Sequence, residues 1–146
     1  MTHRILRSIP LALLALTIPA LTCAAAAEPA SVNVNLSDKG GKDRILLSTN
    51  KVKAGEVEFE ITNTSKVSLH EFLIAPWKGA ITNLPYNDKK GAVIEAKMRQ
   101  LQGVEDMKPG AEATLRLSLK SGPYVVFCNQ PGHYKLGMVA RFTVTK

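Results

Sequence analysis

An alternation of apolar and polar residues, repeated along most of the sequence, constrains the fold more than any other feature. Val57, Phe59 and Ile61 alternate with Glu and Thr residues. This period of two is typical of a strand with one buried face, because successive side chains point to opposite sides of a sheet. Similar alternation, or a short apolar run, occurs at residues 32–36, 45–48, 69–75, 115–119, 124–127 and 140–144.

Turn signals separate these segments, namely Lys39-Gly40-Gly41-Lys42, Ala54-Gly55, Pro109-Gly110 and Ser121-Gly122-Pro123. Short strands with turns at such intervals favour an all-β fold, an antiparallel β-sandwich. Residues 91–102 differ, because Ile94, Met98 and Leu101 recur at helical spacing. We therefore expect one short helix there, which crosses outside the sandwich.

The first 27 residues have the pattern of a secretory signal peptide. Arg4 and Arg7 make a basic start, residues 9–21 are apolar, and small residues lead to Ala27. The apolar run is shorter than the stretch of about 20 residues that a membrane-spanning helix needs. We expect a signal peptide at residues 1–27, one domain at residues 28–146, a periplasmic location and no transmembrane segment after cleavage.

Cys23 offers an alternative for the amino terminus, because it could carry a lipid anchor. Bacterial lipoproteins usually have a small residue directly before the modified cysteine and Leu three residues before it. This chain has Thr22 and Ala20 at those positions. Anchoring at Cys23 is therefore the less favoured expectation.

The charge of the chain is moderately basic and spread out. Of 19 Lys and Arg, Arg4 and Arg7 lie in the leader, which leaves 17 against 12 Asp and Glu, a net charge of about +5. Scattered cations fit a solvated surface, or attraction to an acidic protein or an anionic membrane surface. The aromatic content of 5% and the lack of a recognised motif argue against nucleic-acid binding.

Residues 28–146 contain one cysteine and two histidines, Cys128, His70 and His133, because His3 and Cys23 lie in the leader. A single cysteine cannot form an internal disulfide, and a free thiol in an oxidising compartment needs an explanation. Metal ligation protects a thiolate from oxidation. The presence of a single cysteine and two histidines in residues 28–146 thus indicates a metal site.

Cys128, His133 and Met138 are evenly spaced, with four residues between successive members. They lie between two predicted strands on a loop that can present all three toward one point. His70, in the predicted strand at 69–75, supplies the second histidine. Taken singly, each of these residues would more often be an ordinary buried side chain of the core. Together, two His and one Cys with a weak axial Met form the blue-copper ligand set.

These residues resemble those of cupredoxins, the type 1 blue copper proteins. Residues 127–138 (FCNQPGHYKLGM) are similar to the copper-binding loop, and residues 55–63 (GEVEFEITN) and 69–72 (LHEF) are similar to earlier strands. The loop spacing is similar to that of rusticyanin, auracyanin and sulfocyanin. The resemblance covers essentially all of residues 28–146 and implies a Greek-key sandwich with one copper ion held by His70, Cys128, His133 and Met138.

The resemblance implies a monomer that shuttles single electrons between redox partners, such as a cytochrome or an oxidase. Four protein ligands leave no position for a substrate, which argues against an enzyme. Two histidines are too few for a multicopper oxidase or nitrite reductase. A periplasmic copper-binding protein for tolerance or delivery is the alternative, although Met- or His-rich tracts typical of that role are missing from residues 28–146.

Neighbouring residues have expected roles of their own. By the resemblance, the Glu71 N–H donates to the sulfur of Cys128. Strand alternation directs the Glu71 carboxylate away from His70 and into solvent; the sharper hypothesis is that its ionisation favours Cu(II) and makes the potential depend on pH. Asn129, the residue after Cys128, is expected to lie next to the ligands and help to hold them in place.

An electron exit is also implied by the resemblance. His133 is expected near the surface, framed by residues that dock partner proteins weakly. These residues are Pro131, Tyr134 and Leu136. Ordinary loop packing is the alternative role for Tyr134 and Leu136.

Overall fold

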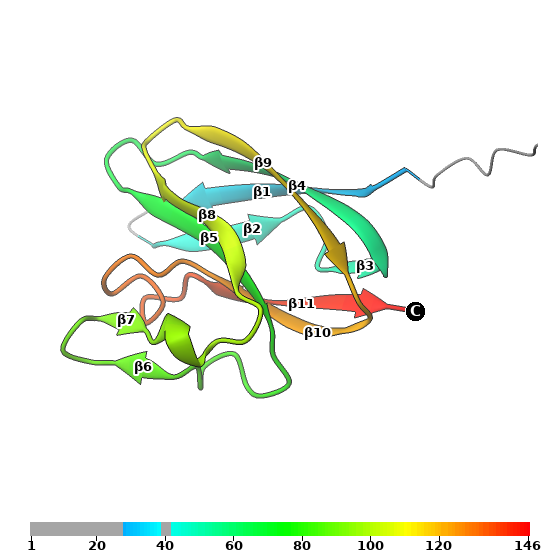
Figure 1. The fold of residues 1–146 in the computed structure, drawn as a ribbon. Helices are drawn as coiled ribbons and strands as arrows, with labels where there is room; N and C mark the ends of the chain where they lie inside the picture. Colours follow the sequence, from blue (N-terminus) through cyan, green and yellow to red (C-terminus); the bar gives the residue numbers. More distant parts are fainter. Residues whose placement is uncertain (1–27, 39–41) are drawn as a thin grey trace, which may run out of the picture.

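Two β-sheets make up most of the computed structural model, which describes residues 28–38 and 42–146 (Figure 1). The expected signal peptide at 1–27, Cys23 and the glycine turn at 39–41 lie outside these residues. In the part that is described, no helix has the length and apolar character needed to cross a membrane.

The sheets contain four and five strands, in the orders β2-β1-β4-β9 and β3-β11-β10-β5-β8, and a separate ribbon pairs β6 with β7. The strands of the first sheet are β1 (Ala30–Ser37), β2 (Arg44–Leu47), β4 (Gly55–Asn63) and β9 (Glu112–Leu119). Those of the second are β3 (Lys51–Lys53), β5 (His70–Pro76), β8 (Gln102–Met107), β10 (Gly122–Phe127) and β11 (Val139–Thr145). The ribbon consists of β6 (Tyr86–Asn87) and β7 (Ala92–Val93).

The predicted all-β sandwich is confirmed, but its sheets are mixed rather than purely antiparallel. Strand β1 runs parallel to β4, and β11 runs parallel to β3. The chain passes through β3 in the second sheet before it returns as β4, so β1 and β4 share a direction. Alternation in a sequence reports which face of a strand is buried; it carries no signal for the direction of the neighbouring strand.

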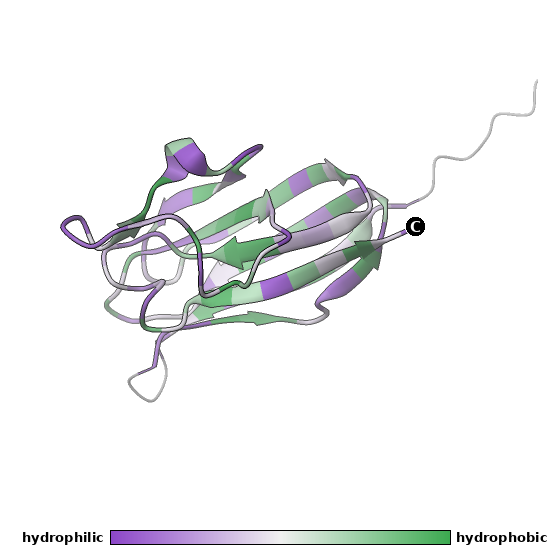
Figure 2. Cartoon of the chain, turned by 90° about the horizontal axis from the view of Figure 1, so that it is seen from below, coloured by the Kyte–Doolittle hydropathy of each residue, from purple (hydrophilic) through white to green (hydrophobic). Residues whose placement is uncertain are grey.

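The core lies between the sheets and is built on three aromatic rings. Phe59 of β4 contacts Phe72 of β5 and Phe142 of β11, with ring centroids 5.1 Å and 5.4 Å apart. All three rings are fully buried. Hydrophobic and hydrophilic residues alternate in bands along the strands in Figure 2, as the sequence pattern predicts. This packing fixes the sheets against each other and hence the positions of the strand ends.

The segment 91–102, for which the sequence predicts a short helix, contains only one turn of 3₁₀ helix. Its residues form β7, a single 3₁₀ turn η1 (Glu95–Lys97) and the approach to β8. Gly91 and Gln100 have φ of 67° and 51°, in the left-handed region, which a continuous right-handed helix does not allow. Met98 is nevertheless buried, because its flexible side chain packs into a second apolar cluster that includes Leu73, Val93 and Phe127.

Strand β8 has no counterpart among the predicted strands, because its sequence QGVEDM does not alternate. It pairs with β5, where His70 faces Met107 and Phe72 faces Val104, so a bulge lies between these pairs. Asp106 adopts a φ of 50° in this bulge. Gly103 allows the close approach to β5, since a Cβ there would collide with the Phe72 carbonyl and the Leu73 side chain.

We expect Gly103→Ala to destabilise the protein by about 2 kcal/mol, the cost typical of forcing a methyl group into a packed position. Urea denaturation followed by circular dichroism measures this loss. Gln102→Ala, at the exposed neighbouring position, is the control and should change stability little. Equal losses of stability in the two variants would contradict the close approach of β8 to β5 at Gly103.

Candidate metal centre

The expected ligands come together at one end of the sandwich, which we call the metal end. His70 is the first residue of β5, and Cys128 follows the last residue of β10. Since β5 and β10 are antiparallel neighbours, the start of one lies beside the end of the other. Strand β11 begins directly after Met138, whose carbonyl accepts a hydrogen bond from the Cys128 N–H at 3.0 Å.

The candidate ligand atoms of His70, Cys128 and His133 all lie within 4.8 Å of one another. The two Nδ1 atoms are 3.2 Å apart, and Cys128 Sγ is 3.5 Å from His133 Nδ1. With metal–nitrogen bonds of about 2.0–2.1 Å, as for zinc, two nitrogens on one ion lie about 3.3–3.6 Å apart in tetrahedral or trigonal geometry. The observed N–N separation of 3.2 Å is close to this range, so both nitrogens can bind one small metal ion after a slight adjustment.

Burial distinguishes His133 from the other three residues. The side chains of His70, Cys128 and Met138 are fully buried, whereas His133 is partly exposed. Cys128 and Met138 belong to the same apolar core cluster. The Nε2 atom of His70 is buried and has no hydrogen-bond partner in the described part of the chain, so the polar contacts of this ring concentrate at Nδ1.

Consecutive tight turns shape the loop from Cys128 to Met138. The N–H groups of His133 and Met138 donate to the carbonyls of Gln130 and His133, respectively, at 3.0 Å. Gly132 and Gly137 have φ of 87° and 106°, values that favour glycine and explain its placement at both turns. Backbone hydrogen bonds thus fix the turns of the loop that carries three of the four candidate ligands.

Asn129 fastens this loop to the β6–β7 ribbon. Its Oδ1 accepts a hydrogen bond from Val93 N–H at 2.6 Å, and its Nδ2 donates to the Val93 carbonyl at 3.2 Å. The same amide nitrogen donates to Glu95 Oε1 at 2.6 Å. The side chain therefore pairs with β7 as a strand would, and it holds the residue after Cys128 in place.

Glu71 lies where strand order predicts, but its surroundings differ from the expectation. Its N–H donates to Cys128 Sγ at 3.3 Å, as the resemblance implies. Its carboxylate is not solvated: the residue is buried, and Oε1 accepts from Gln130 Nε2 at 2.6 Å. Burial raises the pKa of this carboxyl above its ordinary value, despite the hydrogen bond from Gln130. The effect of Glu71 on a copper potential stays a prediction.

Gln130 is a positioning residue that the sequence did not reveal. Its Nε2 bridges Glu71 Oε1 and Asp106 Oδ1, the latter at 3.1 Å. Asp106 lies in the bulge of β8, the strand that pairs with β5 at the edge of the second sheet. Both the burial of Glu71 and the role of Gln130 thus follow from a strand without a sequence signal.

The three residues expected to dock partners separate into two groups. Tyr134 is buried; its hydroxyl donates to the Ile81 carbonyl at 2.9 Å and accepts from Leu84 N–H at 3.1 Å, so it packs the loop instead. Pro131 is exposed, and Leu136 is 67% exposed. Val67 and Leu69, 83% and 41% exposed, lie in the segment that leads into His70 and add apolar surface that sequence reasoning missed.

The protonation states of the metal-free centre are set by burial. Burial raises the pKa of the Cys128 thiol from its ordinary 9.0 to about 11. Burial, followed by the neighbouring His133, lowers the pKa of His70. At neutral pH the metal-free centre therefore contains a thiol and a neutral imidazole, and a bound cation would have to displace the thiol proton.

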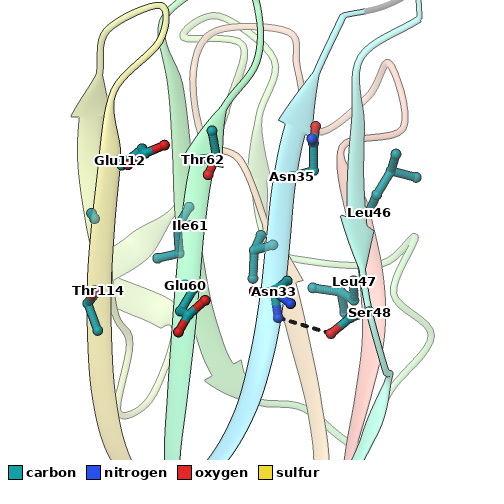
Figure 3. Close-up of a pocket in the computed structure, with 12 residues that line it drawn as sticks. Asn33, Asn35, Leu46, Leu47, Ser48, Glu60, Ile61, Thr62, Glu112 and Thr114 are labelled. Carbon is teal, nitrogen blue, oxygen red and sulfur yellow. Dashed lines mark hydrogen bonds between the residues drawn. The ribbon is translucent and has the colours of Figure 1, made fainter.

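One of the larger hollows among the described residues lies away from the candidate ligands. A groove of about 830 Å³ crosses the outer face of the first sheet (Figure 3). Asn33, Asn35, Thr62 and Thr114 are among the polar residues that line it, and none of the candidate ligands does. Its donor set offers neither sulfur nor imidazole, so it is no candidate for the metal.

Comparisons with known proteins find the same architecture. Rusticyanin from Thiobacillus ferrooxidans superposes with a TM-score of 0.64 at 17% identity, covering 82% of this chain and 79% of that chain. Dithionite-reduced auracyanin from the photosynthetic bacterium Roseiflexus castenholzii gives a TM-score of 0.59 at 20% identity, with coverage of 83% and 100%. No family model matches the sequence, and no curated protein matches it.

These likenesses confirm the expected fold: the chain has the fold of the cupredoxins rusticyanin and auracyanin. Two members of its candidate ligand group, Cys128 and His133, lie in the loop that resembles the copper-binding loop, and the third, His70, lies at the start of β5.

The buried thiol predicts a pH dependence of the metal-free protein. The thiol of the unfolded chain releases its proton near pH 9.0, before the folded thiol does at about 11. Stability is therefore unaffected by this group below pH 9 and falls between pH 9 and 11, by at most about 3 kcal/mol. Urea denaturation of metal-free wild type and Cys128→Ser measures the difference. Parallel stability curves for the two proteins across this range would contradict the prediction.

Proposed function

We propose that this protein is an exported electron carrier that binds one copper ion through His70, Cys128, His133 and Met138. One observation carries the proposal: two imidazole nitrogens and one thiol sulfur meet within 4.8 Å at the end of a rigid sandwich. Met138 supports it as a thioether buried in the same cluster as Cys128. The role of these four residues as ligands is part of the proposal.

Copper is the metal that this donor set favours. Thiolate and thioether are soft ligands suited to Cu(I), while imidazole also satisfies Cu(II). Rusticyanin, whose fold this chain shares, is a copper protein. When bound, copper would supply a one-electron couple between Cu(I) and Cu(II).

The protein would assist electron transfer by holding the ligand side chains in fixed positions. The Glu71 N–H and the loop backbone fix Cys128 and Met138 through hydrogen bonds within the protein. Asn129 and Gln130 attach the loop to β7 and β8. Ligands held in this way move little when the charge at the centre changes, which keeps the barrier to electron transfer low.

Electron exchange would take place through the partly exposed His133. Exposed apolar residues of the two ligand-bearing segments lie at the same end and can exclude water from a brief contact with a redox protein. Those residues are Val67, Leu69, Pro131 and Leu136. A cytochrome or an oxidase is the kind of partner that fits, and a monomer is sufficient for this role.

Export to the periplasm completes the proposal. The basic, apolar and small-residue order of residues 1–27 supports a cleaved signal peptide, with lipidation of Cys23 as the alternative. In an oxidising compartment, copper would also protect Cys128, the only cysteine of residues 28–146.

The visible and electron paramagnetic resonance spectra of the purified protein with one equivalent of Cu(II) test the function. We expect an intense thiolate-to-copper band and narrow copper hyperfine splitting, both removed by reductant and absent in Cys128→Ser. A weak d–d spectrum, or tight Cu(I) binding without a stable Cu(II) form, would contradict electron transfer. That result would favour a copper-binding protein for tolerance or delivery.

Leu136→Glu tests docking at His133. Pressing a carboxylate into an apolar contact costs on the order of 1–2 kcal/mol, so the rate of electron self-exchange between two copies should fall roughly tenfold. Nuclear magnetic resonance line broadening in mixtures of the two oxidation states measures that rate. Ser118→Glu, at an exposed position of β9 that pairs with Glu56 far from the metal end, adds the same charge and should leave the rate unchanged. A loss of the copper spectrum in Leu136→Glu would instead make Leu136 part of the fold.

A further inference from the structure

The end of the sandwich opposite to the metal end, here called the basic end, gathers cations. Strand β10 has six residues, so its start at Gly122 lies about 20 Å from its end at the metal centre. Gly122 pairs with Val144, and Lys53 pairs with Thr145. Across the first sheet, Gly55 pairs with Leu119 at this same end. The segments around these pairs carry the exposed cations Lys53, Lys78, Arg99, Lys120 and Lys146.

Three of these cations line one groove. Lys78, Arg99 and Lys120 surround a depression of about 460 Å³, together with Trp77 and the turn at Ser121 and Gly122. No acidic side chain lines it. Among residues 28–38 and 42–146, none of these three cations forms an ion pair. Their charges are therefore available to an anionic surface.

The acidic residues near this end are too few to offset the cations. Glu28 and Glu56 are exposed at the start of β1 and of β4, outside the groove. At the metal end, by contrast, Asp106 and Lys108 lie two positions apart in the chain, and Gln130 bridges Asp106 to Glu71. Exposed cations thus outnumber the nearby acidic side chains at this end of the fold.

Trp77 lines this groove and is held in place by hydrogen bonds. Its backbone N–H donates to the Pro123 carbonyl at 2.9 Å, and its indole N–H donates to the Ala80 carbonyl at 3.0 Å. Arg141 donates to the carbonyls of Trp77 and Gly79. A partly exposed indole beside Lys and Arg is the combination enriched at membrane–water interfaces, because the ring has an apolar body and a polar edge.

The chain also enters the domain at the basic end. Residue 28 is two positions before β1, whose first residue Ala30 pairs with Val57. Figure 1 shows the start of β1 and the carboxyl terminus on the same side of the molecule. The 27 preceding residues include the apolar run at 9–21 and Cys23, so any retained leader or lipid would hold this end, and not the metal end, at a membrane.

We propose that the basic end docks on anionic phospholipid headgroups through Lys78, Arg99, Lys120 and Trp77. A membrane surface fits better than an acidic protein because three cations, an interfacial tryptophan and the chain entry share one end. Basic clusters of this kind also serve as the second signal that strengthens a single anchor. Docking in this orientation leaves His133 facing away from the lipid and open to partners.

Vesicle sedimentation tests the proposal on the protein purified after export, using phosphatidylcholine vesicles with and without phosphatidylglycerol. Each cation near an anionic surface contributes about fivefold to partitioning, so the triple variant Lys78→Gln, Arg99→Gln, Lys120→Gln should bind about two orders of magnitude more weakly. High salt should release the wild type, because screening weakens such contacts. The triple variant Lys66→Gln, Lys90→Gln, Lys108→Gln has the same net charge, with its changes at exposed lysines near the metal end, and should bind almost as the wild type does.

Trp77 provides a second readout, because it is the only tryptophan in the sequence. On anionic vesicles its fluorescence should shift to the blue and be quenched by brominated lipids. Equal losses in the two triple variants, or binding without quenching of Trp77, would overturn the proposal. So would release by inorganic phosphate at matched ionic strength, which would mark a site for a free anion, or a failure of the wild type to bind anionic vesicles.

Discussion

The antiparallel pairing of β5 with β10 is the constraint on which the candidate centre depends. It brings His70, at the start of one strand, beside Cys128, at the end of the other. The Glu71 N–H, one residue into β5, then reaches the cysteine sulfur. The Phe59, Phe72 and Phe142 rings hold the two sheets together behind this pairing. Ligand geometry is thus a property of the whole sandwich rather than of one loop.

The loop from Cys128 to Met138 adds the remaining candidate ligands to the pair that the strands bring together. Its glycines at 132 and 137 allow the turns that bring His133 and Met138 back toward Cys128. Asn129 and Gln130 then attach it to segments on two different sides, β7 and the bulge of β8. A loop held from both sides presents its donors in a fixed arrangement, which is the requirement for a metal that changes charge without changing ligands.

Much of this arrangement could be predicted from the sequence, because the signals were local. Alternation at Val57, Phe59 and Ile61 indicated a strand with one buried face, and the spacing of Cys128, His133 and Met138 predicted a loop of candidate ligands. The failures concern segments whose structure depends on distant partners. Strand β8 does not alternate, and it forms because Gly103 lets it approach β5. The burial of Glu71 and the bridge made by Gln130 follow from β8, so no local pattern could reveal them.

The two ends of the sandwich expose different kinds of side chain, so each end suits a different kind of partner. The metal end has exposed apolar residues around a partly exposed histidine, and the opposite end has exposed cations around a tryptophan. Apolar surface suits brief contact with a partner, whereas cations suit a polyanionic surface. The strands between them keep the two kinds of surface apart.

Copper K-edge X-ray absorption of the loaded protein in both oxidation states tests the central claim most directly. The account predicts one short sulfur bond and two imidazole nitrogens in Cu(II) and in Cu(I), with only small changes in bond length, because the fold presets the donors. Loss of the sulfur in either state, or a change in the number of imidazoles on reduction, would contradict it.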